Sequence, residues 1–420
     1  MKPVIFDASF ILQSLKDQIP TGIGRVEIAW FNFIKDLKST KFFFIQRYGK
    51  IMLFDETAIS SLSSLIEKKP PSDMGLISRI LWRMGHRRRA VQIDLKRRAI
   101  SIFPANNSDT IATAFGRLFP QRGWYISVGF TSAPQLMIEG IQKARIRTAV
   151  MLHDTIPLDH PKLCIDFVSD DLERAIEYQA RNGDLLLCNS NATASDFSRH
   201  AHRLVGEPPK VKPVVAHLGL HDVKNNTKNT ATLPEQIDPT RPIHVIIGTI
   251  EPRKNHVFLI DLWERMSRDI KPSRMPQLVI IGRWGWKCEH IKSALEDSKE
   301  LNKSIFILEG PDDAVMASVL NSSNTLLMPS ITEGYGLPIL EAARDGIPVI
   351  ANDLAVYREI AGDYPDLCSI DDPEGWERLI KLHSEKLKRL QPPPVPTWGQ
   401  HFERVMNALR EADSTGSKLN

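Results

Sequence analysis

Two glutamates stand eight positions apart in the segment SITEGYGLPILEAARDG. Between Glu333 and Glu341 lie two glycines and Pro338, the residue types of a loop followed by the first turn of a helix. The free N–H groups near Gly336 and Leu337 would then lie at the positive end of that helix, a favourable place for a phosphate. A carboxylate is repelled by a phosphate beside it, so the two glutamates should bind hydroxyl groups instead. Acceptors for hydroxyl groups next to a phosphate site predict a site for a nucleotide sugar. Glutamate in a first helical turn is also ordinary helix chemistry, and that alternative stays open.

The segment GTIEPRKNH adds two cations between an expected strand and an expected helix. Arg253 and Lys254 would stand at the helix N-terminus, where positive side chains oppose the helix dipole. Their position is favourable if they bind a pyrophosphate through charged hydrogen bonds. A pair of solvated loop charges is the alternative.

The N-terminal half offers weaker signals at two places. PTGIGRVE holds Gly22 and Gly24, but Glu27 occupies the last position of a G-x-G-x-x-G pattern, so a structural turn is as good a reading as a phosphate loop. MLHDTIPLDHP places His153 and Asp154 at the end of an apolar strand, where ligands of parallel sheets bind. The sequence holds no Walker loop and no G-x-S-x-G, H-E-x-x-H or D-x-D motif.

Short apolar runs alternate with helical patterns along the chain, which is typical of α/β proteins with parallel sheets. We expect a helix over 25–38, a helix over 166–180 capped by Ser169, and a further helix from about His256. Strands are predicted at 3–9, 41–47, 124–129, 147–154, 184–190, 243–249, 277–282, 304–310, 324–330 and 347–352.

The composition is that of a soluble globular chain of more than one domain. It has 420 residues, 42% hydrophobic and 25% charged. We expect domains at 1–222 and 241–395, a polar linker at 223–240, and a last helix within 396–420. The first residues read as a strand and not as a signal peptide, no run of 18 apolar residues occurs, and the four cysteines are far apart. A reduced, cytoplasmic setting is expected.

A basic segment at 79–98 carries a net charge of +7, whereas the whole chain carries +4. As one helix it would place Ile80, Met84, Val91 and Leu95 on a stripe beside its arginines, which suits an anionic membrane surface or a lipid-diphosphate acceptor. A solvated surface helix, a flexible loop or a nucleic-acid contact are the alternatives, although the segment has one aromatic residue and no known nucleic-acid-binding module. The cations expected to contact the acceptor or membrane are Arg87, Arg88, Arg89, Lys96, Arg97 and Arg98.

Together these motifs resemble the retaining nucleotide-sugar glycosyltransferases of family 4. SITEGYGLPILEAARDGIPVIA is similar to the family's E-x7-E block, and EPRKNH resembles its Arg-Lys phosphate clamp. HDTIPLDHP, CNSNATASDF and TGIGRV match weaker patterns of the N-terminal domain, whereas residues 60–120 match nothing in the family. The resemblance implies a GT-B fold, in which two Rossmann-like domains face each other across a donor-binding cleft, and a last helix that crosses back to the acceptor domain.

The resemblance also implies a role for each matching residue. Arg253 and Lys254 would hold the pyrophosphate, Glu333 a hydroxyl of the transferred sugar, and His153 that sugar from the N-terminal side. Family members act without a metal ion or other cofactor, and retention is ascribed to front-face attack without an enzyme nucleophile. The remaining donor-binding positions would be Gly22, Gly24, Tyr335 (often Phe in the family), Gly336, Leu337 and, for the ribose hydroxyls, Glu341.

The sequence therefore predicts a cytoplasmic hexosyltransferase at the inner face of the membrane, using a saccharide or lipid-linked saccharide acceptor. The RWGWK and HDTIPL patterns resemble mannosyltransferases of bacterial surface polysaccharide synthesis and favour GDP-mannose as the donor. Alternatives are a UDP-sugar-dependent transferase, a phosphorylase or epimerase of the same fold, and a nucleic-acid or anionic-surface binding protein built on 79–98.

Overall fold

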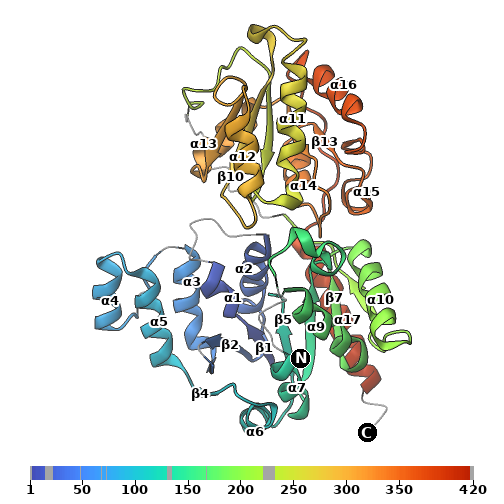
Figure 1. Cartoon of the computed structure of the whole chain (residues 1–420). Helices are drawn as coiled ribbons and strands as arrows, with labels where there is room; N and C mark the ends of the chain where they lie inside the picture. Colours follow the sequence, from blue (N-terminus) through green and yellow to red (C-terminus); the bar gives the residue numbers. More distant parts are fainter. Residues whose placement is uncertain are drawn as a thin grey trace.

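The computed structural model describes residues 2–14, 22–47, 49–67, 69–71, 73–129, 135–166, 168–220 and 232–416. They form two α/β domains, one above the other in Figure 1, each with helices packed on both faces of a central sheet. The predicted linker falls partly outside these residues, because 223–231 are not described.

The N-terminal sheet has eight described strands in the order β4-β3-β2-β1-β5-β6-β7-β8. β3 pairs antiparallel with both β2 and β4, and the other pairs are parallel. The strands are β1 (Val4–Asp7), β2 (Lys41–Arg47), β3 (Lys50–Phe54), β4 (Ser101–Pro104), β5 (Trp124–Ser127), β6 (Arg147–Leu152), β7 (Leu185–Cys188) and β8 (Pro213–Val215).

The C-terminal sheet is parallel throughout its described strands, in the order β11-β10-β9-β12-β13-β14. These strands are β9 (Ile243–Ile247), β10 (Gln277–Gly282), β11 (Ile305–Glu309), β12 (Thr325–Met328), β13 (Val349–Ala351) and β14 (Asp366–Leu367). All ten predicted strands are confirmed. The strands that the sequence did not predict, β3, β4, β8 and β14, all lie toward the edges of the two sheets.

Both faces of each sheet are buried, as alternation along single strands shows. Phe6 of β1 packs with Trp30 and Phe31 on one face, whereas Ile5 packs with Tyr125 on the other. Strands buried on both faces are apolar nearly throughout, so their length and composition identify them in the sequence.

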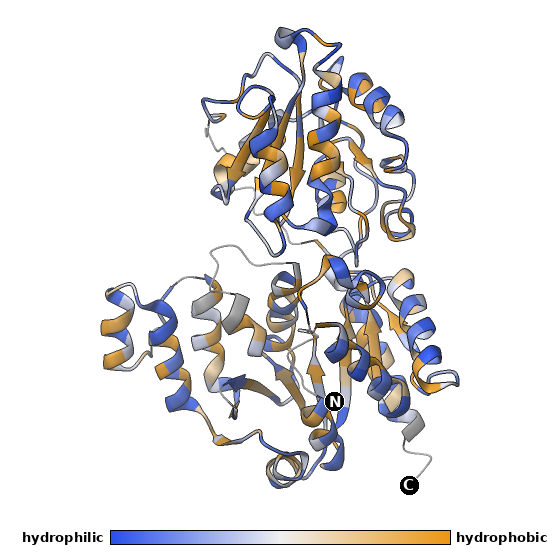
Figure 2. Cartoon of the chain, viewed as in Figure 1, coloured by the Kyte–Doolittle hydropathy of each residue, from blue (hydrophilic) through white to orange (hydrophobic). Residues whose placement is uncertain are grey.

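The helices connect the strands of each sheet and cover its two faces (Figures 1 and 2). Those of the N-terminal domain are α1 (Ser9–Ser14), α2 (Gly22–Lys35), α3 (Ile59–Glu67), α4 (Leu76–Arg83), α5 (Arg87–Arg98), α6 (Ser108–Leu118), α7 (Gln135–Lys143), α8 (Ile156–Asp159), α9 (Val168–Asn182) and α10 (Asn191–Val205). The following helices are α11 (His256–Met266), α12 (Glu289–Asp297), α13 (Asp313–Ser322), α14 (Leu337–Arg344), α15 (Ala355–Ala361), α16 (Pro373–Ser384) and α17 (Trp398–Gly416). Short 3-10 turns lie at Glu56–Ala58, Pro161–Leu163, Pro252–Lys254 and Pro272–Arg274.

Two predicted helix starts differ from the structure. α2 begins at Gly22 and not at Arg25, so both glycines belong to its first turn and not to a preceding loop. α9 begins at Val168, which places Ser169 inside the helix and not at its cap.

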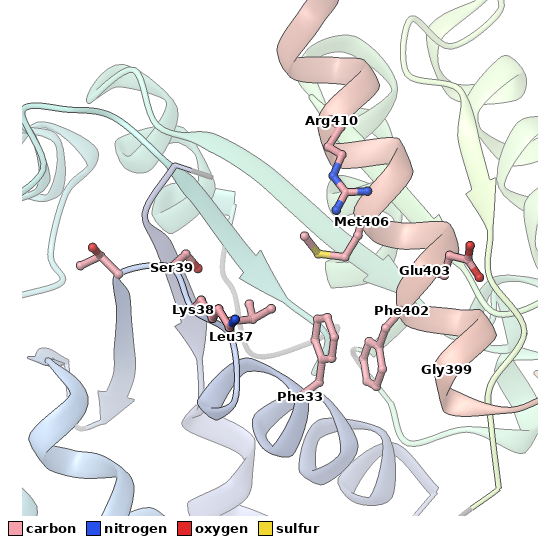
Figure 3. Close-up of a pocket in the computed structure, with 10 residues that line it drawn as sticks. Phe33, Leu37, Lys38, Ser39, Gly399, Phe402, Glu403, Met406 and Arg410 are labelled. Carbon is pink, nitrogen blue, oxygen red and sulfur yellow. The ribbon is translucent and has the colours of Figure 1, made fainter.

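The last helix, α17, packs on the N-terminal domain. The ring of Phe402 stacks on Phe33 of α2, with centroids 3.9 Å apart, and meets Trp30 edge-on. Asp413 forms ion pairs with Lys2 at 2.8 Å and with Arg147 at 3.2 Å. A cavity of about 750 Å³ lies between α2 and α17, and none of the predicted site residues lines it. Phe33 and Phe402 form part of its wall (Figure 3).

The basic segment is not one helix, contrary to the prediction. Gly85 adopts a φ of +84° and separates α4 from α5, because a left-handed residue cannot continue a right-handed helix. Val91 and Leu95 are fully buried in the N-terminal core, whereas Ile80 and Met84 are exposed. The single amphipathic stripe expected from the sequence therefore does not exist.

Within the described residues, no helix is both long and apolar enough to cross a membrane. The four cysteines are unpaired, and Cys188, Cys288 and Cys368 are buried.

Candidate active site

The loop after β12 leads into α14 through a glycine that no other residue could replace without strain. Gly336 has a φ of +110° and caps α14, and a Cβ atom there would lie 2.8 Å from a ring carbon of Tyr357. The loop therefore turns sharply just before α14, whose first backbone N–H group is that of Leu337.

Glu333 is buried and held by both cations of the predicted clamp. Its carboxylate pairs with the guanidinium of Arg253 and, at 2.5 Å, with the ammonium of Lys254. The hydroxyl of Ser330 donates a third hydrogen bond at 2.9 Å. Arg253 also pairs with the buried Glu251 at 2.6 Å. The structure thus brings Glu333 to Lys254 and Arg253, which lie 79 and 80 positions before it in the sequence.

Opposed charges set the protonation of this cluster. Burial raises the pKa of Glu333, but the charges of Arg253 and Lys254 outweigh it and lower that pKa to about 2. Burial lowers the pKa of Lys254, although Glu333 opposes this effect. Glu333 is therefore an ionised, weakly basic carboxylate that accepts hydrogen bonds.

His153 and Asp154 reach the same place from the N-terminal domain, after β6. The imidazole Nε2 of His153 lies 2.7 Å from the carbonyl oxygen of Val128. A carbonyl only accepts, so Nε2 carries the proton and Nδ1 remains an acceptor in the neutral ring. Burial lowers the pKa of His153 and raises that of Asp154, while the charge of Arg253 acts against the rise.

Direct contacts join the two loops across the domain boundary. The hydroxyl of Thr193, in the first turn of α10, lies 3.3 Å from the carbonyl of His153 and 3.4 Å from that of Gly334. A Cβ atom on Gly334 would lie 2.7 Å from the same His153 carbonyl oxygen, closer than real Cβ atoms approach. Glycine at 334 therefore permits the close approach of the domains.

Arg25 is a site residue that the sequence analysis missed. It lies in the first turn of α2, and its guanidinium Nη1 lies 2.5 Å from Oε1 of Glu341 in α14. The ion pair crosses from one domain to the other and joins the glycine motif to the second glutamate. A cation directly after G-x-G was the available signal.

The remaining residues predicted to bind the nucleotide-sugar donor differ in their burial and contacts. Gly22 has open space where a Cβ atom would stand, whereas Gly24 is buried within α2. Tyr335 is buried, and its hydroxyl donates to the carbonyl of Leu218 at 3.0 Å, so it also joins the two domains.

Glu359 of α15 fastens the domains at a further point. Its carboxylate accepts from the backbone N–H groups of Asn191 (2.6 Å) and Ala192 (3.1 Å) at the start of α10, and lies 2.7 Å from Nε2 of His217. A carboxylate at a helix N-terminus is favourable because it meets the positive end of the dipole. Trp286 adds a bond from its indole N–H to the carbonyl of Leu163 at 2.9 Å. The two domains are therefore in contact at the expected donor cleft.

The predicted acceptor or membrane cations do not reach this cleft, since α5 lies at the outer edge of the N-terminal domain (Figure 1). Asp94, which is buried, binds Arg97 at 3.0 Å and Arg98 at 2.7 Å, and Arg98 also binds Asp73. Arg98 is therefore held in a structural ion-pair cluster, to which Arg97 contributes. The acceptor or membrane role of these cations stays a prediction. Among the described residues, no three His, Cys, Asp or Glu side chains are arranged to hold a metal ion.

Two further carboxyl groups are buried near the carboxyl edge of the N-terminal sheet. Asp7, which ends β1, accepts from the hydroxyl of Tyr125 at 2.7 Å and from the backbone N–H of Ser9 at 3.0 Å. Glu27 of α2 accepts from the N–H of Phe10 at 3.2 Å. Burial raises the pKa of both, and the charge of Asp7 raises that of Glu27 further, to well above its ordinary value.

The raised pKa of Glu27 predicts a pH-dependent stability. Above its ordinary pKa of 4.5, the folded chain keeps a proton that the unfolded chain releases, so stability falls as pH rises toward the folded pKa. Glu27→Gln removes this dependence while it keeps the side-chain shape. We expect the variant to unfold at a higher temperature than the wild type at about pH 8 and to lose less stability between about pH 5 and about pH 8.

Thermal unfolding across that pH range tests this expectation. The exposed Glu296→Gln is the matched control and should reproduce the wild-type profile. Parallel profiles for Glu27→Gln and the wild type would contradict the expectation.

Comparison with known proteins agrees with this geometry. Residues 229–388 match the family model described as glycosyl transferases group 1. Among solved structures, HepE of Anabaena in complex with UDP and glucose superimposes with a TM-score of 0.61 at 14% identity, covering 98% of this chain and 100% of that one. The lipopolysaccharide outer core galactosyltransferase WaaB superimposes with a TM-score of 0.52 at 16% identity, covering 98% and 99%. The fold is GT-B, and residues 229–388 are similar to the group 1 glycosyltransferases.

Several curated relatives are bacterial mannosyltransferases at modest identity. The serotype-specific mannosyltransferase WbdA of Escherichia coli is 28% identical over 299 residues, which is 66% of this chain and 35% of WbdA. The O-antigen chain mannosyltransferase B of Escherichia coli is 25% identical over 224 residues, covering 52% of this chain and 56% of that protein. This chain thus spans about a third of the length of WbdA and about half that of the second relative.

Proposed function

We propose that this protein is a glycosyltransferase that transfers a hexose, mannose from GDP-mannose, to a saccharide or lipid-linked saccharide during synthesis of a bacterial surface polysaccharide. The observation that carries the proposal is the cluster of Arg253, Lys254 and Glu333, with side chains 20%, 8% and 8% exposed, opposite His153 at the meeting edges of two sheets. Ligands of parallel α/β sheets bind at such edges. The mannosyltransferase relatives support the choice of sugar.

The cations would bind the donor's diphosphate. In the structure they neutralise Glu333. A diphosphate carries more negative charge than one carboxylate, so it would draw both cations toward itself and leave Glu333 to accept a sugar hydroxyl. The backbone N–H groups of Gly336 and Leu337 would add hydrogen bonds to the phosphate. As the sugar–phosphate bond breaks, these groups stabilise the charge that develops on the leaving diphosphate.

The other residues would orient the sugar and the nucleoside. Nδ1 of His153 is an acceptor for a sugar hydroxyl, and Glu341 is placed to bind the ribose once it parts from Arg25. The charges of Arg253 and Lys254 lower the pKa of Glu333, so this side chain is an ionised acceptor. Transfer would proceed with retention, by front-face attack of the acceptor hydroxyl without an enzyme nucleophile, as the resemblance to family 4 implies. The protein's own cations would act in place of a metal ion.

Nucleotide binding provides the direct test. Thermal unfolding is measured with UDP, GDP, ADP and CDP for the wild type and for Glu341→Gln. At roughly 100 times Kd, a ligand stabilises the fold by about 2.7 kcal/mol. We expect GDP to raise the unfolding temperature of the wild type and to lose most of that effect in the variant.

The other outcomes discriminate between the alternatives. A shift with UDP and not with GDP would replace GDP-mannose by a UDP-linked donor and keep the transferase. No shift with any nucleotide, or an equal shift in Glu341→Gln, would overturn the assignment of the donor site.

A further inference from the structure

α4 exposes large apolar side chains, which are normally buried in a soluble protein. The exposed fractions are 75% for Leu76, 66% for Ile77, 50% for Ile80 and 64% for Met84. Leu76, Ile80 and Met84 are spaced by four residues and therefore lie on one side of the helix. Figure 2 shows the hydrophobic colour on α4 at the outer edge of the N-terminal domain. We call these four residues the α4 apolar face.

This face is directed outward because another side of α4 makes the contacts with the domain. Ser78 is buried, and Leu81 and Trp82 are half-buried against the hydrophobic core. The start of the helix is held from α5, since Asp94 accepts a hydrogen bond from the N–H of Gly75 at 3.3 Å. Arg98 donates to the carbonyl oxygen of Asp73 at 3.3 Å. The exposure of the α4 apolar face is therefore a property of a well-anchored helix.

Cations border the α4 apolar face. Arg79 and Arg83 directly precede Ile80 and Met84 in the sequence, and both are exposed. Exposed cations of α5 include Arg87, Arg89 and Lys96. Other exposed large apolar side chains include Ile165, Leu382 and Leu387, which lie outside this basic neighbourhood. An apolar face with a basic border is the pattern of an interfacial membrane helix.

We propose that α4 and the start of α5 bind the surface of a lipid bilayer that contains anionic lipids. The apolar face would enter the boundary between headgroups and acyl chains, and the arginines would contact lipid phosphates. Nucleic acid would neutralise the arginines but leave four apolar side chains in water. A second copy of the chain would bury the apolar faces but bring the two sets of arginines together. The bilayer satisfies both features, and the inference does not depend on the proposed transfer reaction.

Vesicle co-sedimentation tests this inference with the full chain. One set of vesicles is phosphatidylcholine, and the other contains phosphatidylcholine and phosphatidylglycerol at about 7:3. The apolar variant is Leu76→Ser/Ile77→Ser/Ile80→Ser/Met84→Ser, and the charge variant is Arg83→Gln/Arg89→Gln. The matched control, Leu382→Ser/Leu387→Ser, removes equally exposed leucines from the C-terminal domain.

We expect the wild type and the control to bind anionic vesicles at least tenfold more tightly than neutral ones. The apolar variant should bind anionic vesicles at least tenfold more weakly than the wild type, and the charge variant should lose most of the preference for anionic lipid. All variants should unfold at the wild-type temperature, because the substituted side chains are exposed.

Three results would overturn the inference. The first is equal vesicle binding by the wild type and the apolar variant. The second is no wild-type binding to either vesicle. The third is self-association in buffer, measured by analytical ultracentrifugation, that the apolar variant abolishes, since the α4 apolar face would then bind a second copy.

Discussion

Lys254→Met is expected to reduce the rate of sugar transfer by about 10²–10³-fold, the usual cost of removing one electrostatic stabiliser from an active site. Lys254 is 6% exposed, and its ammonium lies 2.5 Å from Glu333. Methionine keeps much of the apolar stem but cannot bind the leaving diphosphate. The loss should appear chiefly in kcat, because the charge on the leaving group is greatest in the transition state.

The fold should survive this substitution. Loss of one partner from a buried ion pair is severe when the other charge is left alone. Here Glu333 keeps its ion pair with Arg253 and its hydrogen bond from Ser330. Transfer from the nucleotide sugar and thermal unfolding are measured together, so that lost activity is separated from lost structure.

Lys41→Met is the matched control, since Lys41 is also a buried lysine, 7% exposed, but lies in β2 of the other domain and donates to the carbonyl of Leu37. It should transfer sugar at nearly the wild-type rate. Wild-type turnover by Lys254→Met would remove Lys254 from the phosphate site.

Gly334→Ala is expected to slow transfer by about 10–100-fold, as small misplacements of reacting groups do. The added Cβ atom would lie 2.7 Å from the carbonyl oxygen of His153 and 2.9 Å from Cβ of Asp154. Both contacts cross from one domain to the other, so the methyl group must push the loops apart. His153 would then be displaced from the sugar, while Arg253 and Lys254 keep their positions within the C-terminal domain.

Nucleotide binding separates this effect from misfolding. The nucleotide-induced rise in unfolding temperature should persist in Gly334→Ala, because the proposed phosphate and ribose contacts come mainly from the C-terminal domain. Gly116→Ala, in α6 with nothing within 4 Å of the new atom, should leave transfer unchanged. Full activity of Gly334→Ala would show that close approach of the two loops is not required.

The sequence by itself determined the main motifs of the C-terminal domain and all of its described strands except the edge strand β14. Strands such as β9 and β10 are short apolar runs because both faces of a parallel sheet are buried, and this is visible in composition alone. Gly336, Pro338 and the following helix are local features of the chain. The positions of Arg253, Lys254 and Glu333 at the sheet edge followed from the strands that precede them.

Only the tertiary structure decided which side chains are partners. Arg25 and Glu341 are 316 positions apart, and their ion pair exists because two domains close on each other. The periodicity of residues 79–98 predicts one amphipathic helix. In the structure Gly85 divides this segment into two helices, and Val91 and Leu95 are buried in the hydrophobic core. Helical periodicity predicts which side chains lie on the same side of a helix. It does not state whether that side meets a core, a partner or solvent, because this depends on the packing of elements distant in the chain.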